Sequence, residues 1–245
     1  MIKQEHPEIS CVLACYNAQS FLEESFLQVK NVLDNTVFAY EIIMVDDGSS
    51  DQTAAVIKKI QAQNANVRTV FHRKNYGRGK TVCDGFRVSK GQIIGFIDVD
   101  LDNPARYIFP LILNVFYGKA DVCTAKRIYL LKFDFYLLLR WILSRGYSIL
   151  VRFLLGVSLE DTETGCKFFS RDKIMPILRD VKSRGWFWDT EVMVRSYFAR
   201  LKILEMPTIF IRNSHISTVD IVPDIFKYLV NLLRFQKEIK RLKKC

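Results

Sequence analysis

The 245-residue sequence has few of the residues that several enzyme classes require. It contains three histidines, His6, His72 and His215, and none stands at the spacing of a metal-binding pair. This scarcity disfavours a Ser-His-Asp or Cys-His hydrolase and a zinc enzyme. The six cysteines include no CxxC pair, so neither a zinc site nor a redox motif is predicted, and disulfides are not expected in a cytosolic chain.

The sequence also lacks a long hydrophobic run. A helix that crosses a bilayer needs about 18 or more apolar residues. The longest candidate, residues 107–118, is too short and contains Pro110. The first ten residues, MIKQEHPEIS, have no apolar core of the kind found in a secretion signal. We therefore expect a cytoplasmic protein.

Positive charge is abundant and is concentrated in two segments. The formal net charge is +10. Residues 126–157 hold six Lys or Arg and one Asp, and residues 227–245 hold seven Lys or Arg and one Glu, so the rest of the chain is nearly neutral. A local excess of this kind indicates a polyanionic partner such as a membrane surface or a lipid phosphate. Since no nucleic-acid-binding motif accompanies the charge, no nucleic-acid partner is predicted.

Apolar β-type runs alternate with helical patterns through the first half of the chain. The spacing of Ser20 and Glu23 is that of a capping box, which predicts a helix beginning near Ser20. Pro104 suits the first turn of another helix. This alternation predicts an α/β fold with a mostly parallel sheet flanked by helices on both faces. The predicted strands are residues 9–14, 40–45, 67–72, 92–97 and 121–125.

An acidic motif, FIDVDLD, follows the predicted strand at residues 92–97. Asp98 and Asp100 stand two residues apart, and Asp102 supplies another carboxylate. Carboxylate oxygens in this arrangement can bind Mg²⁺ or Mn²⁺, which would bridge a diphosphate and neutralise its charge. Taken alone, such a motif is more often a solvated acidic turn.

A second acidic cluster, Asp46-Asp47-Gly48-Ser49, follows the strand at residues 40–45. Its residue types are common in turns, and Asp51 can cap the next helix. Alternatively, the carboxylates can accept hydrogen bonds from a nucleotide base and from ribose hydroxyls. Ligands of parallel sheets bind beyond the carboxyl ends of the strands, so two acidic strand ends favour a nucleotide site.

The loop NYGRGK, residues 75–80, resembles a phosphate cradle. It combines two glycines, two cations and the start of a predicted helix. Gly79 and Lys80 are therefore candidate ligands of a diphosphate. The loop lacks the GxxxxGK[ST] spacing of a P-loop, which excludes that class of NTPase. A glycine-rich turn with exposed cations is the alternative interpretation.

Two cationic segments, residues 128–157 and 221–245, have apolar residues at helical spacing. Each fits a helix that lies on an anionic membrane surface, and each also fits a helix packed on the protein, or for the second one an oligomerisation helix. The oligomeric state is left open. The cations of the first segment are Lys132, Arg140, Arg145 and Arg152, and the apolar stripe of the second is Ile221, Ile225, Leu229 and Leu233.

Eight segments together resemble the family 2 glycosyltransferases. The resemblance is to the polyprenyl-phosphate branch in particular, typified by dolichol-phosphate mannosyltransferase and dolichol-phosphate glucosyltransferase. Two of the segments, DTETGCKFF and WDTE, would by spacing alone be ordinary helix caps. The segments, in family order, are CYNA (15–18), VDDGSSDQT (45–53), NYGRGK (75–80), FIDVDLDNP (96–104), AKR (125–127), SRG (144–146), DTETGCKFF (161–169) and WDTE (188–191).

The resemblance implies a GT-A, Rossmann-like fold and a role for each matched residue. Arg127 and Arg145 would bind the donor diphosphate and the acceptor phosphate. The residues expected at the nucleotide-sugar are Tyr16, Asp46, Asp47, Gly79, Lys80, Asp98 and Val99. Those expected in catalysis are Asp98, Asp100, Arg127 and Arg145, and those expected at Mg²⁺ or Mn²⁺ are Asp98, Asp100 and Asp102.

Some residues depart from the usual family motifs. Ala14 and Ala18 replace the proline and glutamate of PxYNE, Asp102 replaces a glutamine, and Lys126 replaces the serine of GSR. The donor is therefore left open between the UDP-glucose and GDP-mannose types.

The implied activity is inverting, metal-dependent transfer of a hexose from a nucleotide-sugar to a polyprenyl or dolichyl phosphate, at the cytoplasmic face of a membrane. A phosphate acceptor is already anionic and needs no general base. Two alternatives remain. One is transfer to a saccharide or protein, with Asp161, Asp189 or Glu191 as the base. The other is a silent membrane adaptor on a transferase scaffold.

The expected domain organisation follows from the same motifs. Residues 1–220 form the transferase domain, with a nucleotide-sugar half at 1–125 and an acceptor half at 126–220. Residues 221–245 form a basic amphipathic C-terminal helix.

Overall fold

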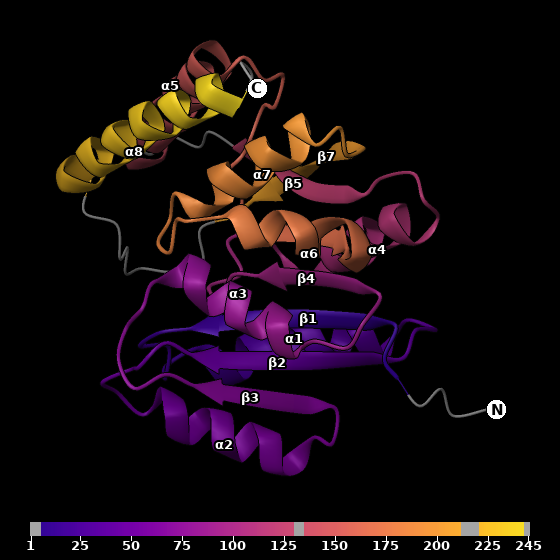
Figure 1. Ribbon diagram of the computed structural model, residues 1–245. Helices are drawn as coiled ribbons and strands as arrows, with labels where there is room; N and C mark the ends of the chain where they lie inside the picture. The colour runs from indigo at the N-terminus through magenta and orange to yellow at the C-terminus, as the bar shows by residue number, and fades with distance from the viewer. Residues whose placement is uncertain (1–5, 130–134, 212–220, 243–245) are drawn as a thin grey trace.

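A single seven-stranded sheet, in the order β3-β2-β1-β4-β6-β5-β7, forms the centre of the molecule (Figure 1). The computed structural model describes residues 6–129, 135–211 and 221–242. The strands are β1 (Ile9–Cys15), β2 (Tyr40–Asp46), β3 (Val67–Phe71), β4 (Ile93–Ile97), β5 (Val122–Tyr129), β6 (Cys166–Ser170) and β7 (Ile203–Phe210). The helices are α1 (Leu22–Asp34), α2 (Thr53–Gln63), α3 (Arg78–Val88), a 3-10 turn η1 (Ala105–Tyr107), α4 (Ile108–Phe116), α5 (Phe135–Leu155), α6 (Arg171–Asp180), α7 (Trp188–Phe198) and α8 (Ile221–Leu242).

Two apolar layers cover the sheet, because successive side chains of a strand point to opposite faces. On β1, Cys11 and Leu13 pack with α1, α2 and α4, whereas Val12 packs with α3, α6 and α7 and with parts of α5 and α8. Figure 1 shows α3, α6 and α7 in front of the sheet and α1 behind it. The predicted α/β fold with helices on both faces is confirmed.

β6 is the strand that breaks the parallel pattern. It runs antiparallel to both of its neighbours, β4 and β5, while β1 to β4 are parallel to one another and β5 is parallel to β7. The carboxyl ends of β1, β2, β4 and β5 therefore lie at one edge of the sheet, together with the start of β6. The first five strands agree with the predicted ranges to within four residues, but β6 and β7 were not predicted.

The start of α1 differs from the capping-box prediction. α1 begins at Leu22, and no side chain caps it. Instead, the Ala18 carbonyl accepts hydrogen bonds from the N–H groups of Phe21 and Leu22, at 3.2 and 3.0 Å. The prediction for Ser20 is wrong, because a backbone turn satisfies these donors. Asp51 lies one residue before the N-cap position of α2, and its Oδ1 accepts the Thr53 N–H at 2.9 Å.

α5 and α8 lie side by side at one end of the molecule (Figure 1). α8 packs on the protein through the buried residues Leu232, Phe235 and Ile239. Leu229 and Leu233, the described members of the predicted apolar stripe, are exposed and take no part in this packing, so contact of the stripe with a membrane stays a prediction. Steps of four residues drift by about 40° around a helix at each step, whereas the buried set alternates steps of three and four.

Some predicted features lie outside the described residues. These are Lys132 and the side chains of Arg140, Ile221 and Ile225. Among the helices that are described, none is long and apolar enough to span a bilayer. The predicted boundary at residues 125 and 126 falls inside β5, so one sheet includes strands from both predicted halves. The division into halves stays a prediction.

Candidate active site

The carboxyl ends of three parallel strands bring predicted residues to one edge of the sheet. Tyr16 follows β1, Asp46 ends β2, and Asp98 follows β4. Cys15 of β1 pairs in register with Asp46 of β2. Tyr16 is 44% exposed, whereas Asp46 is buried. The predicted meeting of two acidic strand ends at one edge is confirmed, and the nucleoside-binding role of these residues stays a prediction.

Asp47 holds the loop between β3 and α3. Its Oδ1 accepts the Tyr76 N–H at 2.8 Å, and its Oδ2 accepts the Gly77 N–H at 2.9 Å. His72 Nδ1 also lies 2.8 Å from Asp47 Oδ1. A buried carboxylate is stabilised by such donors, so the observed role of Asp47 is to fix the backbone of this loop.

The turn after β2 packs tightly against the same loop. Asp46 Oδ1 accepts hydrogen bonds from the hydroxyl and the N–H of Ser49, the latter at 3.3 Å. Gly48 has a φ of +70°, and a Cβ added there would lie 2.4 Å from the carbonyl carbon of Lys74. Glycine is therefore required at this turn both by its conformation and by the lack of space.

Arg78, the first residue of α3, reaches the acidic end of β4. Its Nε donates a hydrogen bond of 2.7 Å to Asp98 Oδ1, and its Nη1 donates to Asp189 Oδ2. Since Asp47 binds the two residues just before Arg78, the acidic end of β2 positions the cation that contacts the acidic end of β4.

Lys167 extends this network into the interior of the protein. Its side chain is fully buried on β6, and its Nζ donates to Asp189 Oδ1 at 2.6 Å and to the Thr164 carbonyl. Asp98, Arg78, Asp189 and Lys167 thus form a chain of alternating charges. Arg78 is one of the two cations of the predicted phosphate cradle, whereas Lys167 was not predicted as a site residue. The available signal for Lys167 was a lysine inside the apolar segment CKFFS.

Asp98 packs against the backbone of Gly165. A Cβ added to Gly165 would lie 1.9 Å from Asp98 Oδ2, and the Asp98 N–H donates to the Gly165 carbonyl at 2.8 Å. Burial raises the pKa of Asp98 to about 6; Arg78 opposes the rise and Asp100 adds to it. The side chain still retains 27% of its exposure, so it can reach a ligand.

Asp100 and Asp102 lie in the turn between β4 and η1. Asp100 Oδ1 accepts the Asp102 N–H at 3.1 Å. Asp102 is buried, whereas Asp100 is partly exposed. Within residues 6–129, 135–211 and 221–242, no three His, Cys, Asp or Glu side chains gather as a metal-binding group. The set of Asp98, Asp100 and Asp102 as metal ligands stays a prediction.

The carboxylate oxygens at this turn suit a hard cation as ligands. Carboxylate oxygens are the ligands of Mg²⁺ and Mn²⁺, and Mg²⁺ is often held by one or two carboxylates together with substrate phosphates and water. Asp98 and Asp100 both retain some exposure at the sheet edge. A protein cage of three ligands is therefore not needed for such an ion.

Gly79, Lys80 and Val99 make protein contacts. A Cβ added to Gly79 would lie 2.3 Å from the Cβ of Trp188, so this glycine allows α3 and α7 to pack closely. Lys80 Nζ pairs with Asp84, and its N–H donates to the Arg184 carbonyl at 2.9 Å. Val99 is buried in the core. The phosphate cradle and the contact of Val99 with the nucleotide-sugar stay predictions.

Arg127 and Arg145 differ in their surroundings. Arg127, near the end of β5, donates through Nε and Nη2 to Asp161, at 2.8 Å each. Its Nη2 also donates to Ser144 Oγ at 3.2 Å, which places the SRG segment of α5 beside it. Arg145 is exposed. The structure thus brings both arginines to one region, but Arg127 is already paired with a carboxylate.

The three carboxylates predicted as alternative bases are all engaged. The pKa of Asp161 is lowered because Arg127 outweighs the effect of burial. Asp189 is paired with Arg78 and Lys167. Glu191 accepts the N–H groups of Lys182 and Ser183 and the Nε of Arg195, at 3.1, 2.9 and 2.9 Å.

Glu163 is an acidic residue that the sequence analysis passed over. Its Oε1 is buried and has no hydrogen-bond partner among the residues that the structure describes. Burial raises the pKa of Glu163 to about 8; Arg127 opposes this rise, and Asp189 and Asp161 add to it. Its sequence signal was its place in the matched segment DTETGCKFF.

Known proteins resemble this chain in sequence and in fold. The family profile described as "Glycosyl transferase family 2" matches residues 10–178. Glycosyltransferase AglD of Haloferax volcanii is 29% identical over 229 residues, which cover 93% of this chain and 36% of AglD. The chain therefore spans about a third of the length of this relative.

Solved structures of glucosyl-3-phosphoglycerate synthase from Mycobacterium tuberculosis have the same fold. The complex with Mn²⁺, UDP and glucosyl-3-phosphoglycerate matches with a TM-score of 0.69 and 18% identity, over 94% of this chain and 80% of that one. The complex with Mg²⁺ and UDP has a TM-score of 0.69 and 19% identity, over 94% and 79% of the two chains.

Proposed function

Because this chain belongs to glycosyl transferase family 2, we propose that it transfers a hexose from a nucleotide-sugar to a polyprenyl or dolichyl phosphate. The observation that carries the choice of acceptor is the engagement of Asp161, Asp189 and Glu191 in ion pairs and backbone hydrogen bonds. A hydroxyl acceptor needs a base to remove its proton. A phosphate acceptor is already ionised at neutral pH and needs none.

The donor would be a UDP-glucose or GDP-mannose type of nucleotide-sugar bound at the shared sheet edge. Tyr16 and Asp46 at the ends of β1 and β2 would contact the nucleoside. Asp98 and Asp100 would hold Mg²⁺ or Mn²⁺, with Asp102 in the same turn. When bound, the ion neutralises charge on the departing diphosphate. The Mn²⁺ and UDP bound by the structurally similar synthase support this assignment.

The chain's own residues would prepare Asp98 for this role. Arg78 binds Asp98 Oδ1 and is itself held by Asp189, which in turn is held by Lys167. A carboxylate fixed in this way does not have to be ordered when the donor arrives, which favours catalysis. Gly165 leaves the space that the Asp98 carboxylate occupies.

The reaction would be a single displacement with inversion. A phosphate oxygen of the acceptor attacks the anomeric carbon while the nucleoside diphosphate leaves from the opposite side, so a β-linked glycosyl phosphate results from an α-linked donor. Arg145 is exposed on α5 and would attract the anionic acceptor toward this end of the site. Arg127, beside Ser144, would support this end of the site.

One observation favours a second candidate function, transfer to a hydroxyl of a saccharide or protein. Glu163 has a buried, unpartnered Oε1 among the described residues and a pKa raised to about 8. A general base is most effective when its pKa lies near the working pH. Glu163 would then take the proton of the acceptor hydroxyl.

The outer surface of α5 would hold the protein on the cytoplasmic face of a membrane. Exposed apolar and cationic side chains recur at steps of three and four residues along this helix, which places them on one face. Phe153 is 84% exposed. The members of this stripe are Leu138, Ile142, Arg145, Ile149, Arg152 and Phe153, and α8 adds the exposed Leu229 and Leu233.

Radiolabelled UDP-glucose or GDP-mannose, incubated with the protein, Mn²⁺ and polyprenyl phosphate, tests the proposed function. We expect label in the organic-extractable lipid, and we expect Glu163→Gln to retain this transfer. Label found only in saccharide or protein, and lost in Glu163→Gln, would establish the second candidate instead. If the protein shows no Mn²⁺-dependent binding of nucleotide, both candidate transferase activities would be rejected. The interpretation as a silent membrane adaptor would then hold.

A further inference from the structure

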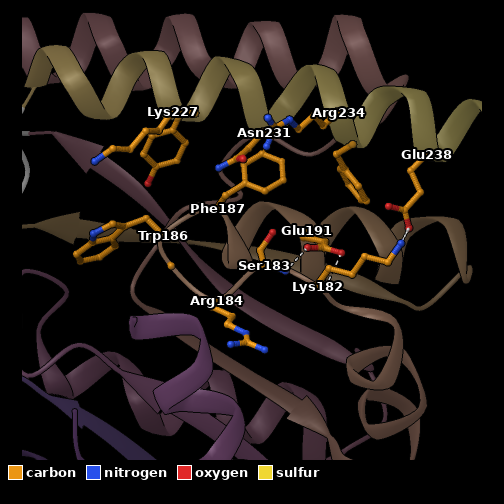
Figure 2. Close-up of a pocket in the computed structure, with 13 residues that line it drawn as sticks. Lys182, Ser183, Arg184, Trp186, Phe187, Glu191, Lys227, Asn231, Arg234 and Glu238 are labelled. Atoms are coloured by element: carbon orange, nitrogen blue, oxygen red, sulfur yellow. Dashed lines mark hydrogen bonds and ion pairs between the residues drawn. The ribbon is translucent and has the colours of Figure 1, made fainter. Parts of the chain in front are cut away.

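A groove of about 720 Å³ lies between α8 and the loop of residues 182–187 (Figure 2). Aromatic rings line much of it, from Trp186 and Phe187 of the loop and from Tyr228 and Phe235 of α8. Trp186 is 38% exposed, so part of this aromatic surface is open to solvent. A groove with such walls can hold an apolar chain.

Both acidic residues of the groove are already neutralised. Glu191 accepts two backbone N–H groups and pairs with Arg195. Glu238 pairs with Arg195 at 2.7 Å and with Lys182 at 3.1 Å. The lining also includes Lys227 and Arg234, so positive charge exceeds negative charge, whereas the Arg184 side chain is directed away from α8 (Figure 2). The groove therefore favours an anionic ligand.

The groove begins next to the candidate active site. The Trp186 ring lies 5.1 Å from the guanidinium carbon of Arg78, which binds Asp98. The Arg184 carbonyl accepts the Lys80 N–H, and a Cβ added to Gly77 would lie 2.8 Å from that carbonyl oxygen. The loop that forms the groove is therefore seated on the start of α3.

Figure 2 shows how the two walls face each other. Lys227 and Asn231 are directed from α8 toward the side formed by Trp186 and Phe187. The cationic end beside Trp186 is thus the end nearest to Arg78. An anionic head placed there would lie toward the donor site, and an apolar chain would extend along the rings.

We propose that this groove binds the acceptor as a phosphate monoester carrying an apolar chain, with the phosphate at Lys227 beside Trp186 and the chain passing Phe187 toward Arg234. The assignment rests on the proposed function for the nature of the acceptor. It adds a binding site that is separate from Arg127 and Arg145.

Farnesyl phosphate, a short soluble phosphate monoester, is the probe for the test. Its binding to the full chain is measured by calorimetry without donor or membrane. We expect the double variant Lys227→Gln/Arg234→Gln to weaken binding at least tenfold. The matched control Lys237→Gln/Lys240→Gln removes the same charge from the same helix outside the groove, and should change binding less than twofold.

A second pair of variants tests the apolar wall. Trp186→Ala should weaken farnesyl phosphate binding at least fivefold, whereas Tyr117→Ala, at a ring that is 67% exposed away from the groove, should leave it unchanged. Circular dichroism confirms that each variant is folded. Equal binding of inorganic phosphate and farnesyl phosphate would overturn the apolar part of the proposal, and equal losses in both charge variants would overturn the site.

Turnover measurements separate this proposal from the proposed function. If lipid phosphate is glycosylated, the groove variants should raise the KM for the acceptor and leave the KM for the donor unchanged. Transfer with an unaltered acceptor KM would sink the groove assignment while the proposed function stands. Farnesyl phosphate binding that depends on Lys227 and Arg234, without any transfer, would support the groove and overturn the proposed function.

Discussion

Lys167 Nζ lies 2.6 Å from Asp189 Oδ1, and neither side chain is more than 2% exposed. Arg78 contacts the second oxygen of the same carboxylate and then reaches Asp98. The acidic end of β4 is thus supported by an ion pair inside the protein. This support has consequences for stability as well as for the site.

Removal of the Lys167 charge should destabilise the fold. Lys167→Met leaves Asp189 buried with Arg78 as its remaining cationic partner, and breaking a buried pair costs about 3 kcal/mol or more. Urea denaturation gives the free energy of unfolding. Lys173→Met is the control, because Lys173 is half exposed and lies 3.9 Å from Asp172, and we expect a change below about 0.5 kcal/mol there. Similar losses in both variants would contradict a special role for the buried pair.

A methyl group at Gly165 should displace the Asp98 carboxylate. The added Cβ would lie 1.9 Å from Asp98 Oδ2, so Gly165→Ala should lower kcat/KM more than tenfold. In Asp98→Ala the displaced group is absent, so adding Gly165→Ala should cause little further loss. A double-mutant cycle on kcat/KM measures this coupling. Additive losses would show that Gly165 acts independently of Asp98.

Asp100 should be needed for metal-dependent donor binding but not for folding. Asp100→Asn keeps an oxygen that can accept the Asp102 N–H while it removes the negative charge. We expect the melting temperature to stay within about 2 °C, because partly exposed substitutions usually change stability little. Calorimetry of UDP with and without Mn²⁺ should show loss of the metal-dependent component. Wild-type protein treated with EDTA should behave in the same way, and retained Mn²⁺ dependence in the variant would reject this ligand.

Glu163 should make the protein less stable as the pH rises. Its pKa is raised from 4.5 to about 8 by burial, so the folded state keeps a proton that the unfolded state releases. The stability from the protonated form is complete below pH 4.5 and is lost as the pH rises to about 8. Glu163→Gln has no such proton, so its melting temperature should exceed that of the wild type by several degrees at pH 9. The difference should vanish near pH 4.5, and a difference independent of pH would contradict the raised pKa.

Phe153 should contribute to membrane binding. Its side chain is 84% exposed on α5, and a charge there would remove apolar contact with the acyl chains. Phe153→Asp should reduce sedimentation with vesicles of phosphatidylcholine and phosphatidylglycerol several-fold. Val37→Asp is the control, because Val37 is 95% exposed between α1 and β2 and should have no effect. Equal partitioning of the two variants would remove α5 from the membrane surface.

The early strands and the acidic edge could be predicted because their signals are local. β1, β2 and β4 are largely apolar runs, Asp46 ends β2, and Asp98 directly follows β4. The parallel sheet then brings Asp46 and Asp98 to one edge by topology alone. The side chains that contact these residues could not be predicted in the same way. Arg78 is 111 residues from Asp189 in sequence, and nothing in the spacing of either residue indicates the contact.

The strands and ion pairs of the second half of the chain were harder to predict from sequence, for a physical reason. β6 has five residues and includes the fully buried Lys167, so its pattern does not resemble a central strand until the partner Asp189 is known. Asp161 and Glu191 look like helix caps in sequence, but each is engaged by an arginine, Arg127 or Arg195. Long-range ion pairs of this kind follow from tertiary packing.

The direction of β6 determines how the chain segment around α5 is anchored. β5 ends and β6 begins at the same edge of the sheet, so the chain leaves and re-enters the scaffold at one place. The segment between these two points also contacts the edge, because Gly165 packs on Asp98 and Asp161 pairs with Arg127. A change in the length of α5 would therefore be felt at the edge where Asp98 lies, because both ends of this segment are fixed there.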